Sequence, residues 1–459
     1  MKRKSHDPSF DPTPDQPLSL PTVAASVVDQ LALVICWSRT EPARLGECAF
    51  VGRAPVALGR GGPRSDDSGP RAEFLAMRPG RNKPRPPLGA PNLSRYHLRL
   101  VTDQARLTFE RHGKGPVVRD GLPEDFGHAA PGSTLFLANE LLLLFERRPT
   151  SFPDSALSRT PDFTFGRADA FGLAGESPAA WRLREQIRFA AGSGAPLLVQ
   201  GPAGAGKDLA ARAVHAASAW RERSFVLLGG ATLGRADLDA LQARADAPFV
   251  VIDELADVPS EIQPFLARGI ALATSQPLPR TRIVAMSTTG LPSQEAPRPE
   301  LASRFVLTIR VPGFEERTCD IPLVTRAILA EIAREQPEVG ARFFEAWDSA
   351  TLSGEPRLSP ALVDRLLRHE WQAHARELTA LLWTAMTTAK TSWVDLTPEV
   401  LAQLEATPST HCDPATLDAR AVQQALDDAR GRVAVAARKL GLKNRWVLYR
   451  LMEKLDIVT

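Results

Sequence analysis

The stretch PLLVQGPAGAGKD, residues 196–208, decides the fold of the middle of this chain. Its apolar start is typical of a strand and its glycine-rich middle of a tight loop, and a helical pattern follows Lys207. Gly201, Gly204 and Gly206 let successive backbone N–H groups face phosphate oxygens at the positive end of that helix. Lys207 is placed to reach the outer phosphates. This order of elements predicts a nucleotide site in a parallel α/β sheet.

A second apolar run, FVVI at 249–252, ends in two acids and completes this candidate site. Asp253, at the end of the predicted strand, is suited to hold Mg²⁺, and Glu254 to orient or deprotonate an attacking water. Asp208 occupies the position where a phosphate loop usually carries a Ser or Thr ligand of Mg²⁺. The residues therefore favour nucleotide binding more strongly than nucleotide hydrolysis.

Length and composition bound the class of protein. A chain of 459 residues with 44% hydrophobic residues holds two to four packed domains, and its net charge of +3 excludes no partner by itself. The apolar runs are too short to cross a bilayer, and the first residues lack the apolar core of a signal peptide. The four cysteines are scattered, which argues against a zinc ribbon or a disulfide framework and suits a reducing cytoplasm: Cys36, Cys48, Cys319 and Cys412.

The chain divides into segments of different character. Short β-like runs fill residues 25–148 and predict an all-β sandwich, with the Pro-, Gly- and Arg-rich stretch 61–91 as a mobile loop. Strand and helix patterns alternate over residues 171–313, as in a parallel α/β domain. Residues 314–395 carry helical patterns without strand signals, and three helical periods fill 417–459. The other segments are expected to be a flexible tail and two linkers: 1–24, 149–170 and 396–416.

Residues 172–395 resemble the AAA+ module of bacterial sigma-54-dependent activators. The resemblance implies ATP and Mg²⁺ as ligands, and the family normally carries an acid where Asp208 stands. It also implies trans-acting arginine fingers at Arg298 and Arg304, a sensor arginine at Arg376 in a helical lid, and a homo-oligomer between a dimer and a hexameric ring. A guanidinium fits these roles because it is permanently charged and grips phosphate through two N–H groups. The matching stretches are GESP (175–178), GKDLAARAVH (206–215), IDEL (252–255), RIVA (282–285), RPELASR (298–304), ERTCDIP (316–322) and WQAHAREL (371–378).

Three departures from the family pattern change what this resemblance implies. The GAFTGA-containing loop, through which the family contacts the sigma factor, is missing from the interval 224–248. The strand that normally presents an Asn to the catalytic Glu carries Gly229 there, and the sensor Asn after the fourth strand is replaced by Thr288. The first departure argues against contact with sigma-54 and against opening its promoters. The other two departures weaken the expected coupling between the bound nucleotide and conformational change, and they also weaken the case for ATP hydrolysis.

The β-rich part, residues 25–148, resembles a forkhead-associated (FHA) domain. A phosphothreonine brings nearly two negative charges and three acceptor oxygens. Arg60, the Ser94 hydroxyl and Arg95 are the right groups to meet it from adjacent loops. The family's Asn-Gly-Thr-Asn stretch is replaced by RHGKGPVVRD at 111–120, which counts against recognition of the peptide backbone. The resemblance implies a phosphothreonine-containing partner protein, and a purely structural β domain is the alternative. Its carrying stretches are GR (59–60), SRYH (94–97), PG (131–132) and LLLLF (141–145).

Residues 417–459 resemble the helix-turn-helix of the Fis family, through GRVAVAARKLGLKNRWVLYR at 431–450. Gly441 lies where a tight turn between two helices needs a positive φ or a close approach. The turn is one residue longer than the family pattern, so the register of base contacts stays open, and a charged helix that only dimerises is the alternative. The residues expected to meet DNA are Arg432, Lys443, Asn444, Arg445, Trp446, Tyr449 and Arg450.

The sequence therefore predicts three functional parts in order: an all-β FHA sandwich, an α/β AAA+ domain with a helical lid, and an all-α helix-turn-helix. The predicted function is a cytoplasmic, DNA-binding transcription regulator that binds ATP, senses a phosphothreonine partner and contacts no membrane. Two other classes remain open. One is a phospho-dependent scaffold that binds ATP without turnover, and the other is an ATP-driven remodeller of another protein.

Overall fold

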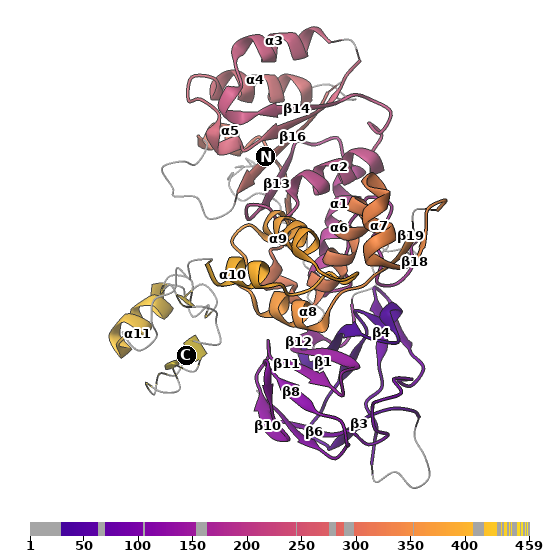
Figure 1. Ribbon diagram of the computed structural model, residues 1–459. Helices are drawn as coiled ribbons and strands as arrows, with labels where there is room; N and C mark the ends of the chain where they lie inside the picture. The colour runs from indigo at the N-terminus through magenta and orange to yellow at the C-terminus, as the bar shows by residue number, and fades with distance from the viewer. Residues whose placement is uncertain are drawn as a thin grey trace, which may run out of the picture.

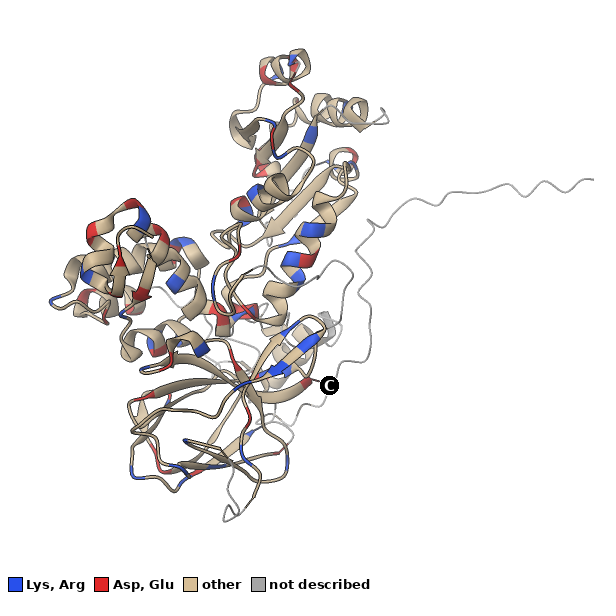
Figure 2. Cartoon of the chain, turned by 90° about the vertical axis from the view of Figure 1, so that its right-hand side faces the viewer, with Lys and Arg blue, Asp and Glu red and all other residues tan. Residues whose placement is uncertain are grey.

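The computed structural model describes most of the chain in nine continuous segments. These are 29–62, 69–103, 106–152, 163–244, 246–274, 281–288, 298–351, 353–406 and 417–428, together with single residues between 433 and 457. From the N-terminus the chain forms a β domain, a parallel α/β domain and a helical region (Figure 1). Lys/Arg and Asp/Glu residues are interspersed over the β domain, the α/β domain and the helical region (Figure 2).

The β domain, residues 29–152, is a sandwich of two antiparallel sheets. An eight-stranded sheet has the order β5-β4-β2-β1-β12-β11-β8-β9, and a four-stranded sheet has the order β10-β7-β6-β3. Alternate apolar side chains of both sheets, among them Leu33, Leu98 and Phe109, meet in one core. The strands are β1 (Asp29–Ser38), β2 (Cys48–Phe50), β3 (Val56–Leu58), β4 (Leu75–Arg78), β5 (Arg81–Pro84), β6 (Leu98–Thr102), β7 (Leu107–Arg111), β8 (Val117–Arg119), β9 (Leu122–Pro123), β10 (Phe126–Ala129), β11 (Thr134–Leu137) and β12 (Leu141–Pro149).

The prediction of a mobile loop over residues 61–91 is wrong for residues 69–91. This part contains β4 and β5, which pair with each other, and β4 also pairs with β2. Phe74, Met77 and Leu88 are buried. The free energy gained by burying these three side chains exceeds the cost of the low strand propensity of the surrounding Pro and Gly residues.

The α/β domain has a five-stranded parallel sheet in the order β14-β15-β16-β13-β17. Side chains of alternate strand positions pack on its two faces: one core lies under α1 and α2, and the other under α3, α4 and α5. Between β14 and β15 the chain passes through a short 3-10 turn and the single helix α3. The bounds are α1 (Pro178–Ala191), β13 (Leu197–Gly201), α2 (Lys207–Ala217), β14 (Phe225–Gly229), α3 (Arg235–Ala243), β15 (Phe249–Asp253), α4 (Gln263–Thr274), β16 (Arg282–Thr288), α5 (Pro299–Ala302) and β17 (Leu307–Arg310).

The helical region differs from its prediction in two places. A hairpin of β18 and β19 interrupts the helices, although residues 314–395 showed no strand signal. Helix α10 lies inside the predicted linker 396–416, because Val400 and Leu404 pack into the core of this region. The region consists of α6 (Ile321–Glu335), α7 (Pro337–Phe343), β18 (Phe344–Asp348), β19 (Ser353–Pro356), α8 (Pro360–Arg368), α9 (His374–Thr388) and α10 (Pro398–Ala406).

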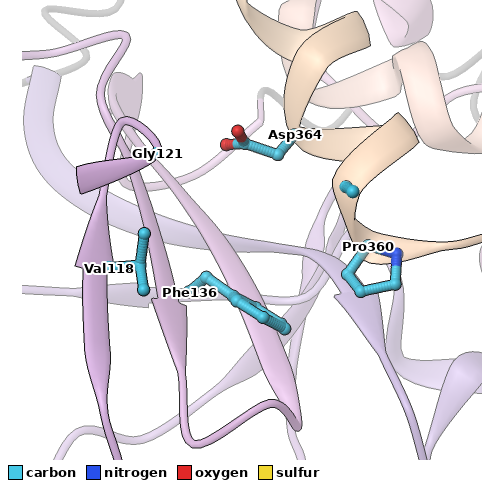
Figure 3. A pocket seen from close by; sticks show the side chains of 6 residues that line it. Val118, Gly121, Phe136, Pro360 and Asp364 are labelled. Atoms are coloured by element: carbon cyan, nitrogen blue, oxygen red, sulfur yellow. The ribbon is translucent and has the colours of Figure 1, made fainter. Parts of the chain in front are cut away.

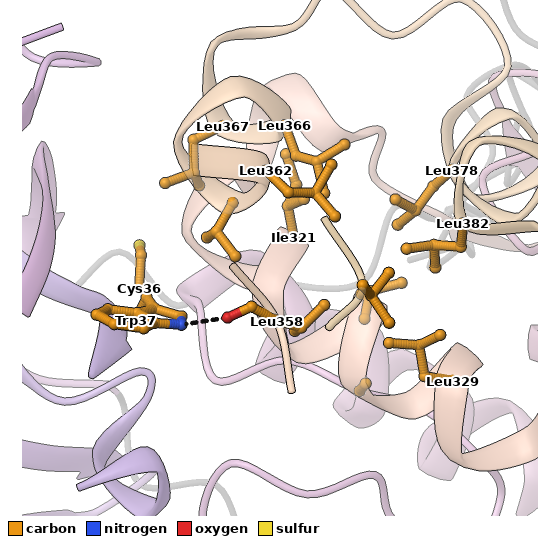
Figure 4. Packing of buried hydrophobic residues seen from close by; sticks show 14 of the residues in the cluster. Cys36, Trp37, Ile321, Leu329, Leu358, Leu362, Leu366, Leu367, Leu378 and Leu382 are labelled. Carbon is orange, nitrogen blue, oxygen red and sulfur yellow. Dashed lines mark hydrogen bonds between the residues drawn. The ribbon is translucent and has the colours of Figure 1, made fainter. Parts of the chain in front are cut away.

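The β domain is docked on the helical region through an apolar core that both share. Trp37 of β1 donates its indole N–H to the carbonyl oxygen of Leu358 at 2.8 Å. Figure 4 shows the Trp37 ring directed at Leu358, with leucines of α8 and α9 on the other side of this contact. Beside this core a cavity of about 220 Å³ lies between the sheet residues Val118 and Phe136 and the start of α8 at Pro360 (Figure 3).

The last described part contains α11 (Ala419–Asp428) and a small apolar cluster. Val422 and Leu426 of α11 pack with Ala436, Leu448 and Leu451. The bounds of any further helices lie outside the described residues, as does the tail 1–24. None of the helices in the described parts of the chain has the length and apolar character that crossing a bilayer requires.

Candidate nucleotide-binding site

The carboxyl edge of the parallel sheet brings the two predicted nucleotide motifs together. In the strand register Gly201 lies opposite Thr288, and Gly229 lies opposite Asp253. All four positions are at or near the ends of neighbouring strands, which is where open α/β sheets bind ligands. Glu254 follows immediately after Asp253.

The backbone of the phosphate loop has a conformation that favours glycine at two positions. Gly204 and Gly206 have φ of 72° and 98°, in the left-handed region. Helix α2 begins at Lys207 and has no side-chain cap. Its first N–H groups are therefore available to phosphate oxygens at the positive end of the helix dipole, which fits the phosphates of ATP.

Lys207 lies under this loop and is held by three oxygens. Its ammonium donates to the carbonyl oxygens of Gly201 (3.1 Å) and Pro202 (3.4 Å) and to the hydroxyl of Thr288 (3.0 Å). Burial lowers the pKa of Lys207, while the charges of Glu254 and Asp253 act in the opposite direction. An outer phosphate placed here would meet a partly desolvated cation.

In the described part of the chain, the hydrogen bonds to the Glu254 carboxylate come from Thr288, at the end of β16. The Thr288 backbone N–H donates to Oε1 at 2.7 Å, and the Thr288 hydroxyl donates to Oε2 at 2.6 Å. Glu254 has a φ of 54°, which is costly for a residue with a side chain. The sequence marked Thr288 only as a replaced sensor residue, and its contact with the acid was not predicted.

Asp253 and Asp208 are the carboxylates available to a magnesium ion. Mg²⁺ on nucleotide phosphates takes one or two protein carboxylates and keeps its remaining ligands as phosphate and water. Asp253 is exposed at the end of β15, and Asp208 is exposed in the first turn of α2. Both therefore suit a hydrated ion at this edge of the sheet.

The helical region touches the phosphate loop at the start of α9. The Ala375 N–H donates to the Gly204 carbonyl oxygen at 3.0 Å. A Cβ added to Gly204 would overlap the carbonyl oxygen of Ala373 and lie 3.1 Å from the Cβ of Arg376. Arg376 is exposed, and its charge acts on Lys207. The structure thus brings the predicted sensor arginine to the loop, and Figure 1 shows α9 next to β13.

The two predicted arginine fingers lie at the ends of the short helix α5. Arg298 precedes α5, where its N–H donates to the side-chain oxygen of Gln263 at 2.9 Å. Arg304 follows this helix, and both arginines are exposed. Within the described parts of the chain neither guanidinium has a side-chain partner. Their position leaves both guanidinium groups accessible to a neighbouring molecule.

The short segment 314–321 contacts all three parts of the protein. The Phe314 N–H donates to His374 Nδ1 at 3.2 Å, next to the start of α9. Arg317 donates to the carbonyl oxygen of Ala205 in the phosphate loop at 3.2 Å. The 3-10 turn Thr318–Asp320 lies against β1 of the β domain, and Cys319 is part of the shared apolar core.

A buried carboxylate, Glu176, connects the β domain to α1. Arg78, at the end of β4, donates to both Glu176 oxygens, at 2.6 and 3.2 Å. The Trp181 indole and the Gly166 N–H donate to the same carboxylate at 3.1 and 2.9 Å. Residues 163–170, at the C-terminal end of the predicted linker 149–170, are therefore packed against the domains that they connect. In the sequence, Glu176 stands out only as part of the family stretch GESP.

The three residues expected to meet phosphothreonine gather at one end of the β sandwich. The Arg60 N–H donates to the Ser94 carbonyl oxygen at 3.0 Å, and the Ser94 hydroxyl accepts from the Lys114 N–H at 3.1 Å. Arg60 and Arg95 are exposed. Arg71, which the sequence did not single out for this site, donates to the carbonyl oxygens of Arg60 (3.1 Å) and Arg95 (2.6 Å). Backbone N–H groups of Arg60 and Lys114 thus meet Ser94, and the Arg71 side chain bridges the backbones of Arg60 and Arg95.

The buried His97 supports this loop. Its Nδ1 accepts from the Ser94 N–H at 3.4 Å, and a Cβ on Gly113 would overlap it. Burial lowers the pKa of His97, and the nearby Arg111 charge lowers it further. A neutral His97 therefore braces the loop from inside the domain.

The residues expected to meet DNA fall almost entirely outside the described part of the chain. Tyr449 is described and is 42% exposed. The expectations for Arg432, Lys443, Asn444, Arg445, Trp446 and Arg450 concern residues outside it.

Comparison with known proteins finds similarity to bacterial regulators. Residues 173–242 match the family model of the Sigma-54 interaction domain. The transcriptional regulatory protein ZraR of Escherichia coli K12 is 26% identical over 336 residues, which cover 64% of this chain and 70% of ZraR. The response regulator protein PilR of Pseudomonas aeruginosa is 28% identical over 328 residues, covering 62% and 70%. The structure of NtrX from Brucella abortus with ADP is 23% identical with a TM-score of 0.41, covering 62% and 69%.

The chain is homologous to transcriptional regulators that carry a sigma-54 interaction domain. Its middle part has the mixed α/β architecture of that AAA+ class, preceded by a β-rich domain.

Proposed function

We propose that this protein is an ATP-binding transcription regulator that binds DNA through residues 417–459. The observation that carries the proposal is the arrangement around Lys207. The phosphate loop, Glu254, Thr288 and the start of α9 lie around one position at the sheet edge. Mg²⁺ held by Asp253 would neutralise phosphate charge there, and Glu254 would orient water. The homology to transcription regulators supports a DNA target in a bacterial cytoplasm.

Binding of ATP would also promote the assembly of several copies of this chain. Arg298 and Arg304 are exposed and would reach the outer phosphate bound by a neighbouring copy, which gives a homo-oligomer up to a hexameric ring. Because α3 alone occupies the route from β14 to β15, apart from a short turn, we propose that the protein does not open sigma-54 promoters.

DNA binding tests this proposal most simply. In a gel-shift assay the full chain should bind DNA fragments of its own genome. Arg445→Ala should weaken this binding by about 1–3 kcal/mol. The same protein with ATP should form no open complex at a sigma-54 promoter. If neither the parent nor Arg445→Ala bound DNA, the proposed role as a transcription regulator would be contradicted. An open complex at the sigma-54 promoter would contradict only the proposal that the protein does not open such promoters.

We further propose that the β domain binds a phosphothreonine-containing protein. Arg60, Ser94 and Arg95 supply two charges and a hydroxyl on adjacent loops, and Arg71 ties these loops together. Two guanidinium groups would match the three acceptor oxygens of a phosphate.

Arg60→Ala should weaken the binding of phosphothreonine peptides about 10- to 100-fold, since hydrogen bonds to charged groups contribute ~1.5–3 kcal/mol. Arg81→Ala, which removes an exposed arginine of β5, is the matched control and should bind as the parent does. Fluorescence polarisation with phosphorylated and unmodified peptides would measure this. Equal affinity for the phosphorylated and the unmodified peptide would contradict phosphothreonine recognition and favour a purely structural role of the β domain.

A further inference from the structure

A hydrogen bond of the buried His374 joins the start of α9 to the segment 314–321. His374 Nδ1 accepts from the Phe314 N–H at 3.2 Å, and the two rings meet edge to face with centroids 5.7 Å apart. A backbone N–H can only donate, so Nδ1 carries no proton here and the proton of the neutral imidazole is on Nε2. This hydrogen bond therefore exists only while His374 is neutral.

The two segments that this hydrogen bond joins both contact the phosphate loop. On one side of it, the Ala375 N–H donates to the Gly204 carbonyl oxygen at 3.0 Å. On the other side, Arg317 donates to the Ala205 carbonyl oxygen at 3.2 Å. The grip of α9 and of the segment 314–321 on the loop therefore depends on the bond at His374.

The surroundings of His374 allow a second arrangement of its ring. Glu315 Oε2 lies 3.8 Å from the same Nδ1, and this carboxylate is about half exposed. A protonated Nδ1 would donate to Glu315 and would no longer accept from the Phe314 N–H. His374 also has a φ of 45°, which is costly unless its surroundings hold it. Protonation thus exchanges a bond in the interior for one at the surface.

The charges that face His374 come from the segment 314–321 and from α9 itself. Burial lowers the pKa of His374, and the Glu315 carboxylate acts in the opposite direction. Arg317 also lowers this pKa, whereas Glu377 of α9 and Glu316 raise it. The lowering prevails, so His374 is neutral at neutral pH and gains a proton in acidic solution.

We propose that His374 is a positioning residue that holds the start of α9 on the phosphate loop while it is neutral and releases it when protonated; this inference rests on the proposed binding of ATP. Release would move the Ala375 N–H and the Arg376 guanidinium away from the loop. Bound ATP then favours the neutral form of His374. By linkage, the affinity for ATP is fully present above the pKa of His374 and falls as the pH drops through it.

Calorimetry of ATP binding by the full chain between about pH 7.5 and about pH 5 tests this role. His374→Asn is the direct variant, because asparagine tolerates a positive φ and its amide oxygen accepts from an N–H without titrating. The parent should lose about tenfold more affinity than this variant over that range, since protonation sets two donors against each other in the interior. Protonation of ATP itself affects both proteins equally. His128→Asn, which replaces an exposed histidine of β10, is the matched control and should keep the pH dependence of the parent.

Glu315→Gln tests the second arrangement while leaving His374 in place. Loss of the carboxylate destabilises the protonated ring, so the fall in ATP affinity should move to lower pH. Equal pH dependence of the parent and His374→Asn, or an unmoved midpoint in Glu315→Gln, would overturn the role of His374. Absence of ATP binding by the parent at neutral pH would instead contradict the proposed function itself.

Discussion

Replacing Glu176 by alanine should lower the free energy of unfolding by about 3–5 kcal/mol, the usual cost of removing one partner of a buried ion pair. The carboxylate has a side-chain exposure of 1% and accepts hydrogen bonds from Arg78, Trp181 and the Gly166 N–H. Without it, the Arg78 guanidinium, with a side-chain exposure of 13%, would remain buried and lack its counter-charge. The β domain should then separate more readily from α1.

Chemical denaturation followed by tryptophan fluorescence would measure this loss, since Trp181 contacts the carboxylate. Glu331→Ala is the matched control because Glu331 also pairs with an arginine, Arg334, but both side chains are about half exposed. We expect that control to change stability by less than about 1 kcal/mol. Similar, small effects of both variants would show that the buried pair does not hold the domains together.

Gly204→Ala should weaken ATP binding about tenfold or more. The left-handed φ of 72° costs an alanine ~1–2 kcal/mol. In addition, the new Cβ would overlap the Ala373 carbonyl oxygen. The start of α9 would have to move away from the loop, and Arg376 would move with it. We expect the change in affinity to exceed the change in overall stability.

The matched control is Gly192→Ala at the end of α1. Gly192 has a right-handed φ of −74°, and the nearest atom to an added Cβ is 3.5 Å away. This variant should bind ATP as the parent does. If Gly204→Ala also bound ATP normally by calorimetry, close contact between the loop and α9 would not matter for the site.

The nucleotide motifs could be predicted because their chemistry is local in sequence. A strand, a glycine-rich loop and Lys207 in sequence order imply the position of the phosphates, and the carboxyl ends of parallel strands bring Asp253 and Glu254 to the same edge. The sandwich was likewise indicated by short apolar runs separated by turn residues, such as those that form β1 and β12. In each case a few neighbouring residues contain the signal.

The residues that connect the parts could not be predicted, because their partners are far apart in sequence. Glu176 meets Arg78 across 98 residues, and Trp37 meets Leu358 across 321 residues. Strand β4 was missed since its apolar residues are few and lie among Pro, Gly and Arg, and their burial depends on β2. The contact of Thr288 with Glu254 depends on the strand order, which no single motif reveals.

Titration of the full chain with ATP and Mg²⁺ in a calorimeter tests the central claim most directly, namely that the loop at Lys207 encloses a nucleotide. The account predicts saturable uptake of one ATP per chain, and a loss of that uptake in Lys207→Ala. No heat of binding in the parent, or equal binding by Lys207→Ala, would contradict it.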